Sequence, residues 1–225
     1  MINKTFEILI PTINRADLLN PSLEFYIDNF PNTTIRVFDN GHQNIFEHER
    51  VKVKKSTTNL GVAGSWNFLA DICFRESEFA LFLNDDIRIL ANEDKILDFC
   101  KFSKKTKFYC GNISNSFQCY LLSKQIWQRV GKFDTMFFPA YWEDIDYKAR
   151  MKNLSIDIIQ VETLSYKEFE VGGSSNKNPI LIEGFHKNRK YYYSKWGSID
   201  NPYRHPFNVE PSKDDILKDF LSQFK

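Results

Sequence analysis

The sequence lacks a long hydrophobic run, an excess of either charge and any closely spaced pair of cysteines. No stretch approaches the roughly 20 consecutive apolar residues that a membrane-spanning helix needs, so we expect no transmembrane segment. The 30 lysines and arginines balance 29 acidic residues, which gives a formal net charge of +1. The chain therefore has no overall field that would attract nucleic acid or an anionic membrane, and we predict no nucleic-acid partner.

The four cysteines also lack the spacing of a metal or redox motif, because none forms a CxxC pair (Cys73, Cys100, Cys110, Cys119). This pattern favours buried free thiols in a reducing compartment over disulfides or zinc ligands. The first residues, MINKTFEILIPT, carry a short apolar run without a small-residue cleavage site, so we expect a strand there rather than a signal peptide. These absences predict a cytoplasmic location.

The first half of the sequence alternates short β-rich runs with segments of helical periodicity. Strands are predicted at residues 7–10, 35–38, 51–54 and 79–83. Helices are expected from Asn20 and Pro21, from Gly64 and Ser65, and from Asn92. This order predicts an α/β fold with a Rossmann-like, mixed but mostly parallel sheet flanked by helices, in a single domain.

The second half of the sequence is less regular. We expect strands at 117–122 and 156–161, a short helix capped by Ser123 and closed by Gly131, and a Gly/Ser/Asn loop at 171–178 before a helix from Pro179 through Tyr193. Residues 1–200 are predicted to form the domain and residues 201–225 an extension. Ser212 and Asp215 resemble a capping box before a last amphipathic helix, which could dock on the domain or contact a lipid surface.

Polar segments follow the early strands, where ligands bind in such folds. They are 11–15, 39–41, 56–64 and 84–86. Asn84 and Asp86 should share one side of their strand end while Asp85 takes the other. Two oxygen ligands in that position suit Mg²⁺ or Mn²⁺, although Asn and Asp also favour ordinary turns.

Three of these segments could contact a nucleotide, and each has a simpler interpretation. Asp39 could accept from a base N–H or from ribose hydroxyls, or it could close a turn. The glycine-rich segment NLGVAGSWN, residues 59–67, could aim backbone N–H groups at a phosphate, although such loops before helices are common. Arg15 beside Thr12 could bind a phosphate or be solvated.

The segment GKFDTMFFPAYWEDIDYKAR, residues 131–150, places Glu143 and Asp144 at an expected helix start. The helix dipole keeps such a carboxylate ionised, whereas burial among aromatic rings (Phe138, Tyr141, Trp142) raises its pKa. A carboxylate in this setting suits a general base, and the alternative is an acidic helix start over a hydrophobic plug. Asp146 and Arg150 are spaced for an ordinary helical ion pair.

Together these motifs resemble the family-2-like glycosyltransferases with the GT-A fold, especially the rhamnosyltransferase-like branch. The matching segments stand in family order over roughly residues 5–150: IPTINR, VFDNG, NLGVAGSWN, LNDD in the place of the DxD motif, and the segment 131–150 in the place of the acidic acceptor-side motif. The later KWG and NPYRHPFN segments are a weaker match.

The resemblance implies an inverting transfer of a sugar from a UDP-, GDP- or dTDP-type donor to an acceptor hydroxyl of a glycan or glycoconjugate. It implies a nucleotide-sugar pocket formed by Thr12, Asn14, Arg15, Asp39, Asn59, Gly61, Asn67, Asn84 and Asp85. Asp86 would hold a divalent cation, Mn²⁺ or Mg²⁺. Asp144 would be the general base with Glu143 as the alternative, and Trp142 with Tyr141 would form a platform for the acceptor or a sugar.

Two positions depart from the family pattern. Asn84 occupies the first position of the DxD motif, and the stretch SYKEFEVGGSS lacks the expected metal-binding histidine, so that Lys167 is an alternative charge for the diphosphate. The competing predictions are a catalytically silent nucleotide- or sugar-binding module and a sugar-nucleotide nucleotidyltransferase. The latter would usually carry a glycine- and basic-rich loop where this chain reads PTINR.

Overall fold

Seven strands form the central sheet in the order β3–β2–β1–β4–β7–β6–β8. The computed structural model describes residues 4–169 and 179–196. The strands are β1 (Lys4–Thr12), β2 (Ile35–Asp39), β3 (Val51–Lys55), β4 (Ser77–Leu83), β6 (Phe108–Cys110), β7 (Cys119–Ser123) and β8 (Ile158–Gln160). Strands β1 to β4 are parallel, and β7 runs antiparallel to both β4 and β6. The carboxyl ends of β1, β2 and β4 therefore meet at one edge.

A second, two-stranded sheet extends this edge. Strand β5 (Ile87–Ile89) pairs antiparallel with β9 (Tyr166–Glu168), which follows the short 3-10 helix η1 (Glu162–Leu164). The N–H of Phe169 also donates to the carbonyl of Asp86 at 2.9 Å. The pairing thus holds residues 166–169 beside the Asn84–Asp86 turn.

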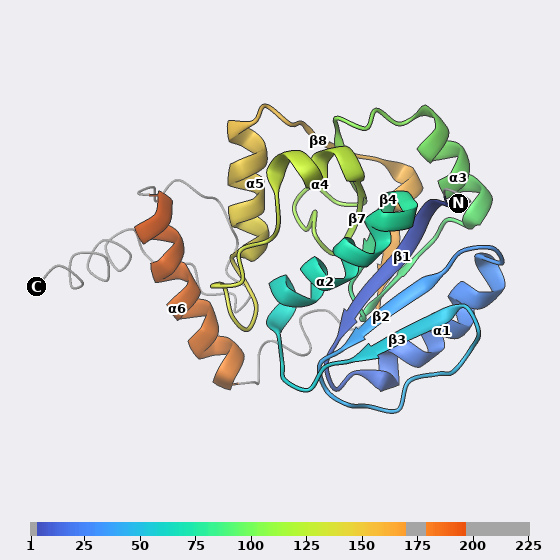
Figure 1. Cartoon of the computed structure of the whole chain (residues 1–225), viewed down its shortest axis with the longest axis horizontal. Coiled ribbons are helices and arrows are strands. Elements are labelled where there is room, and N and C mark those ends of the chain that lie inside the picture. The colour runs from blue at the N-terminus through green and yellow to red at the C-terminus, as the bar shows by residue number, and fades with distance from the viewer. Residues whose placement is uncertain (1–3, 170–178, 197–225) are drawn as a thin grey trace, which may run out of the picture.

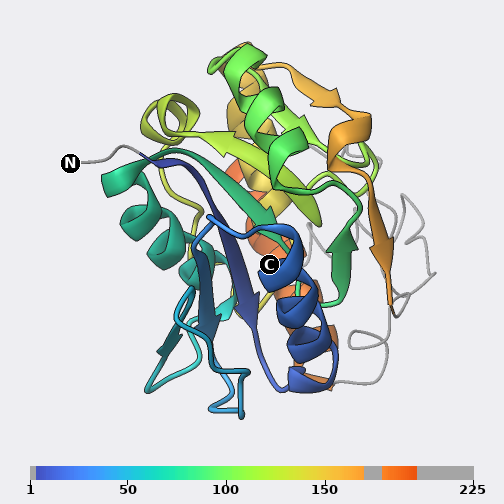
Figure 2. The same ribbon diagram turned by 90° about the vertical axis from the view of Figure 1, so that its right-hand side faces the viewer.

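Helices cover both faces of the large sheet (Figures 1 and 2). Helices α1 (Ala16–Asn29) and α3 (Glu93–Phe102) pack on one face, and α2 (Gly61–Glu76), α4 (Lys124–Val130) and α5 (Glu143–Asn153) pack on the other. Alternation along β1 supplies both cores, because Ile8 and Ile10 face α1 while Leu9 faces α2. The result is a three-layer α/β/α arrangement, which confirms the predicted fold class.

Helix α6 (Pro179–Trp196) lies outside the three layers, beyond α5 (Figure 1). It forms a third apolar cluster with the segment before α5, made of Phe137, Trp142, Ile145, Phe185, Tyr192 and Tyr193. Within the described parts of the chain, no helix is long and apolar enough to cross a membrane.

Several local predictions are confirmed. The Asn92 side chain accepts from the N–H of Lys95 at 3.2 Å, the Ser123 hydroxyl accepts from the N–H of Ile126 at 3.1 Å, and Gly131 ends α4 with φ 86°. All four cysteines are buried and free. The predicted loop at 171–178 and the extension at 201–225 lie outside the described residues.

The predicted starts of two helices were wrong. Helix α1 begins at Ala16, and the side chain of Asn20 bonds to the backbone of Asn44 (3.1 Å) and Phe46 (2.9 Å) instead of capping the helix. Helix α2 begins at Gly61 rather than near Ser65, whose hydroxyl donates to the Gly61 carbonyl one turn earlier. Strands β5, β6 and β9 were not predicted, and β7 and β8 are shorter than the predicted runs 117–122 and 156–161.

Candidate active site

The loops that follow β1, β2 and β4 are joined at the carboxyl edge of the sheet. The Thr12 hydroxyl donates to Oδ2 of Asp85 at 2.7 Å and accepts from Nε2 of Gln43 at 2.9 Å. The other amide atom of Gln43 accepts from the N–H of Ala16 at 2.6 Å, at the start of α1. Gln43 was not a predicted site residue, since it lies beyond the VFDNG segment, yet it connects all three loops.

The acidic turn after β4 contains two adjacent carboxylates of different character. The pKa of Asp85 is raised to about 7: burial and the charge of Asp86 raise it, while the Thr12 hydrogen bond and the nearby Arg15 guanidinium oppose the rise. Crowded carboxylate oxygens of this kind are the donors that Mg²⁺ and Mn²⁺ prefer, so the residues fit such a cation. In the residues described, no group of three or more His, Cys, Asp or Glu side chains forms a protein-only metal cage. Lys167 is exposed on β9.

The loop after β1 lies against the turn after β2. Asn14 has φ 55°, in the left-handed region, and a Cβ on Gly41 would come within 2.4 Å of its Oδ1. Arg15, at the start of α1, forms an ion pair with Asp17 through Nε at 3.3 Å. The close approach requires glycine at position 41, and it places Asn14 and Arg15 at the same edge as Asp85.

Asp39 organises the turn after β2. It is fully buried, and its two oxygens accept from the N–H groups of Gly41 (2.8 Å) and Gln43 (2.9 Å). The buried carboxylate therefore closes its own turn in this structure, the simpler of the two interpretations, and its contact with a base stays a prediction. The next residue, Asn40, joins this turn to α2 by donating to the Ser65 hydroxyl (2.8 Å) and accepting from the N–H of Leu60 (2.9 Å).

The glycine-rich segment before α2 holds another loop of the protein. The N–H of Gly61 donates to the Asn59 side chain at 2.8 Å, and the N–H of Val62 donates to the carbonyl of Pro139 at 2.9 Å. Gly61 has φ 68°, and a Cβ there would lie 2.6 Å from the same carbonyl. These amides are engaged within the protein, so the phosphate-binding prediction for Asn59 and Gly61 does not match this conformation.

Asn67 has a similar role one turn further along α2. It is buried, its Nδ2 donates to the carbonyl of Phe133 at 2.9 Å, and its Oδ1 accepts from the N–H of Phe133 at 2.8 Å. This two-way pairing fixes the segment 131–142 to α2. The structure thus gives Asn67 a structural role, and its predicted position near a nucleotide stays a prediction.

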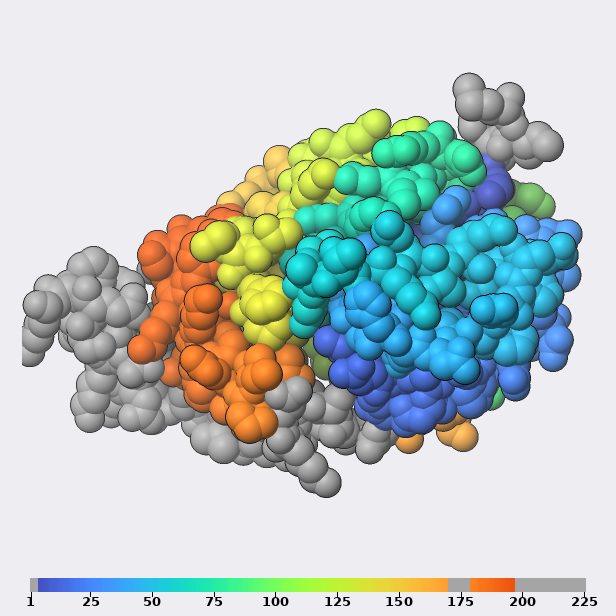
Figure 3. All heavy atoms as spheres, turned by 60° about the horizontal axis from the view of Figure 1, so that its bottom comes forward, coloured from blue at the N-terminus to red at the C-terminus, as the bar shows by residue number. Residues whose placement is uncertain are grey.

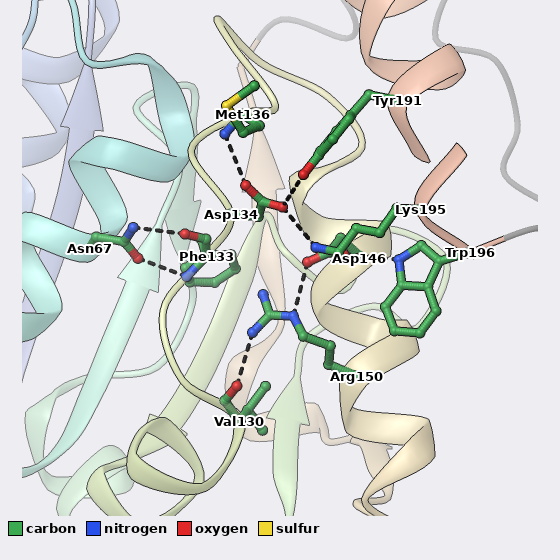
Figure 4. A network of polar contacts seen from close by, with 10 residues as sticks. All are labelled: Asn67, Val130, Phe133, Asp134, Met136, Asp146, Arg150, Tyr191, Lys195 and Trp196. Atoms are coloured by element: carbon green, nitrogen blue, oxygen red, sulfur yellow. Dashed lines mark hydrogen bonds and ion pairs between the residues drawn. The ribbon is translucent and has the colours of Figure 1, made fainter. Parts of the chain in front are cut away.

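Helix α6 is joined to the segment 131–142 through Asp134 and to α5 through Asp146 (Figure 4). Asp134 accepts from the Tyr191 hydroxyl (2.9 Å) and from the Lys195 ammonium (2.7 Å). The fully buried Asp146 accepts from Arg150 (2.9 Å), from the Trp196 indole (2.9 Å) and from the same Lys195 (2.7 Å). The expected Asp146–Arg150 pair is confirmed, and Figure 3 shows this segment, in yellow, between α6 and the start of α2.

Tyr141 and Trp142 form a sharp turn directly before α5, with φ 74° and 76°. The Trp142 side chain is only 3% exposed, and its ring packs against those of Phe185, Tyr192 and Tyr193. A ring covered in this way offers no face to a sugar, so the structure does not support the platform role predicted for Trp142. Tyr141 is half-buried and touches Phe185 edge-on.

Glu143 and Asp144 begin α5 and differ in exposure and in the charges around them. Glu143 is 5% exposed, whereas Asp144 is half-buried. Burial raises the pKa of both carboxyls; the charge of Asp144 raises that of Glu143 further, while Lys148, one turn along the helix, opposes the rise at Asp144. Asp144 is therefore the more accessible carboxylate of the pair and the one that ionises with a cation beside it.

Two stacked aromatic side chains connect the start of α5 with the strand that ends in the acidic turn. Tyr120 of β7 lies directly opposite Phe82 of β4, two residues before Asn84, and the two rings stack at 4.6 Å. The charges of Glu143 and Asp144 both act on the Tyr120 phenol. The start of α5 thus lies near the Tyr120–Phe82 stack, and the acidic turn begins two residues after Phe82.

Comparison with known proteins relates this arrangement to sugar-transferring enzymes by fold. No family model and no curated protein sequence matches the chain. Solved structures do match: a mannosyltransferase from Pyrobaculum calidifontis in complex with GDP-Man and Mn²⁺ (13% identity, TM-score 0.58), TarS of S. aureus (15%, 0.56), and GalNAc-T7 with UDP, GalNAc and Mn²⁺ (11%, 0.59).

These matches cover 96%, 98% and 96% of this chain, which spans 68%, 43% and 54% of the respective structures. They share the mixed, mostly parallel sheet with helices on both faces. This chain is therefore a three-layer α/β protein, and its particular fold is GT-A, as the resemblance of its sequence motifs implied.

Proposed function

We propose that this protein is a glycosyltransferase that moves a sugar from a nucleotide-diphospho-sugar to an acceptor hydroxyl of a glycan or glycoconjugate, with inversion at the anomeric carbon. One observation carries the proposal: the carboxylate pair at the start of α5 acts on Tyr120, whose ring stacks on Phe82 of β4, two residues before the acidic turn. A transferase needs two acidic groups of this kind, one near the donor phosphates and one near the acceptor.

The acidic turn after β4 is the proposed site of the donor phosphates. Asp86, with Asp85 and Asn84 beside it, would hold Mn²⁺ or Mg²⁺, which supplies positive charge for the departing diphosphate. Thr12, Asn14 and Arg15 lie at the same edge and line the nucleotide side. The Mn²⁺ present with GDP-Man or UDP in two of the fold relatives supports this assignment.

Asp144 is the proposed general base. It accepts the proton of the acceptor hydroxyl while that oxygen attacks the anomeric carbon from the side opposite the leaving diphosphate, and such in-line displacement inverts the centre. Lys148 favours its ionised form, and partial burial keeps the carboxylate basic. Glu143, more deeply buried and beside this negative charge, is the weaker candidate.

Several finer assignments belong to the same proposal. They are a hexosyl or deoxyhexosyl donor of the kind used in the rhamnosyltransferase-like branch, and a cytoplasmic location. The arrangement favours an enzyme over a silent binding module, because a binder has no need of a poised carboxylate pair. It also disfavours a nucleotidyltransferase, whose phosphate loop would replace PTINR after β1.

The experiment is a panel of UDP-, GDP- and dTDP-sugars tested for hydrolysis and transfer with and without Mn²⁺. Asp144→Asn is expected to lower turnover by roughly 10²–10⁴-fold, the usual contribution of a general base. Asp157→Asn is the matched control, because Asp157 is exposed and pairs only with the Lys107 ammonium among the described residues. Unchanged turnover in Asp144→Asn, or no turnover of any donor by the wild type, would refute the proposal.

The cation is tested separately by binding. Asp86→Ala should weaken binding of UDP or GDP in Mn²⁺ and leave binding in EDTA unchanged. Equal weakening in both buffers would remove Asp86 from the cation site. The configuration of the product, read from its anomeric proton coupling, decides between inversion and retention.

A further inference from the structure

A group of buried polar atoms beneath the start of α5 has no hydrogen-bond partner among the described residues. They are the hydroxyls of Tyr120 and Tyr147, Oε2 of Glu143 and Oδ1 of Asp144. Tyr120 and Tyr147 are completely buried. Buried polar groups nearly always have a partner, so four together require an explanation.

The two tyrosines come from different elements and pack against the same phenylalanine, and the Tyr120 phenol lies near the carboxylate pair. Tyr120 projects from β7 and Tyr147 from α5, one turn after Glu143 and Asp144. Both rings contact Phe117, at 4.9 Å and 6.0 Å between centroids. Burial, then Tyr147, then the charges of Glu143 and Asp144 raise the pKa of the Tyr120 phenol, so the phenol stays protonated and is a donor near those carboxylates.

The chemistry of the four atoms is complementary. The phenols donate and the carboxylate oxygens accept, yet no direct hydrogen bond joins them. A single O–H group can satisfy both kinds, because its oxygen accepts from a phenol while its proton is donated to a carboxylate. Buried water molecules in proteins typically occupy such polar sites with two to four partners.

We propose that Tyr120 is a positioning residue: its phenol donates to a bridging O–H group, either a water molecule or the acceptor hydroxyl, and that group donates to the Glu143–Asp144 pair. The inference rests on the proposed function for its catalytic meaning, since it specifies how the base is held. The bridge stabilises the ionised form of the pair and aims it at the acceptor.

This role differs from that of an ordinary buried tyrosine, for which Tyr26 is the matched example. Tyr26 is also completely buried, but its hydroxyl donates directly to the carbonyl of Ile87 at 3.0 Å. Removing the Tyr26 hydroxyl leaves a buried carbonyl without a partner and should lower stability. Removing the Tyr120 hydroxyl breaks no hydrogen bond within the described protein.

The test compares Tyr120→Phe with Tyr26→Phe in the full chain. For each variant we would measure Tm by thermal unfolding and the carboxyl titration by infrared difference spectroscopy, with the bands assigned from Glu143→Gln and Asp144→Asn. Lys148 faces the pair from α5 and Tyr147 lies beside it, so both residues are kept unchanged.

We expect Tyr120→Phe to keep or raise Tm and to move the titration midpoint of the pair upward by about one pH unit, because a donor to the ionised form is lost. Nucleotide-sugar hydrolysis should fall about tenfold in kcat with the donor KM unchanged. Tyr26→Phe should lower Tm and leave the titration in place. A Tm loss in Tyr120→Phe as large as in Tyr26→Phe, or an unmoved midpoint, would overturn the proposal.

The two levels of the hypothesis fail in distinguishable ways. If the wild type turns over no donor but the midpoint still moves in Tyr120→Phe, the bridge stands and the transferase assignment fails. If donors are turned over but the midpoint does not move in Tyr120→Phe, the transferase assignment stands and the bridge fails. Repeating the wild-type titration with glycerol identifies the bridging molecule: a shift indicates an alcohol hydroxyl, and no shift indicates water, both consistent with one O–H bridge.

Discussion

Substitution of Asn67 should destabilise the protein without removing a nucleotide contact. Its side chain satisfies both the N–H and the carbonyl of Phe133, and all of these groups are buried. Asn67→Ala leaves two buried backbone groups unpaired, at about 1–3 kcal/mol each when no water reaches them. We therefore expect a loss of about 2–6 kcal/mol, a large share of the roughly 5–15 kcal/mol that stabilises a typical domain.

Urea unfolding followed by tryptophan fluorescence provides the measurement. The midpoint should fall while the slope m stays the same, since the buried surface hardly changes. Asn29→Ala is the control: this half-buried asparagine makes one local bond to the carbonyl of Phe25, and its loss should change stability by only about 0.5 kcal/mol.

The opposite pattern would refute this reasoning. If Asn67→Ala kept its stability but bound UDP, GDP or dTDP more weakly than the wild type, Asn67 would face a nucleotide, as the family resemblance implied. A combined loss is expected only in proportion to the unfolded fraction, which the unfolding curve supplies.

Two further substitutions test the same region. Gly61→Ala should cost more than Gly131→Ala: both positions have a left-handed φ, worth about 1–2 kcal/mol, but a Cβ at 61 would also lie 2.6 Å from the Pro139 carbonyl, whereas at 131 it meets no atom within 4 Å. Equal Tm losses would show that the close approach is unimportant. Lys148→Met removes the cation that lowers the pKa of Asp144, so the acid limb of the kcat/KM–pH profile should move to higher pH. A limb that stays in place would separate Asp144 from the rate-controlling ionisation.

Most strands of the large sheet were predictable because their signals are local. Alternation along β1 sends Ile8 and Leu9 to opposite cores, and the helix caps at Asn92 and Ser123 each bond to a residue three positions away. The edge position of the Asn84–Asp86 turn followed from the strand that precedes it.

The site was harder to predict because its partners are far apart in the sequence. Asn20 bonds to residues 24 and 26 positions away, and Asn67 to one 66 positions away, so each side chain fixes a loop that its local sequence does not indicate. Trp142 is covered by α6, whose position no local pattern could indicate. Tyr120 lies in an apolar strand and carries no motif, and only the packing of α5 over β7 brings it to the carboxylate pair.

The two consecutive residues with left-handed backbone, Tyr141 and Trp142, make the orientation of the α5 carboxylates depend on helix α6. Such backbone costs roughly 2–4 kcal/mol for the two residues, and it persists only where neighbours oppose its relaxation. Here the buried Asn188 of α6 donates to the carbonyls of Ala140 (2.9 Å) and Tyr141 (3.1 Å). Helix α6 therefore holds the strained turn in place. A chain shortened before Pro179 would keep its sheet, but the turn would relax and the carboxylates at the start of α5 would change their orientation.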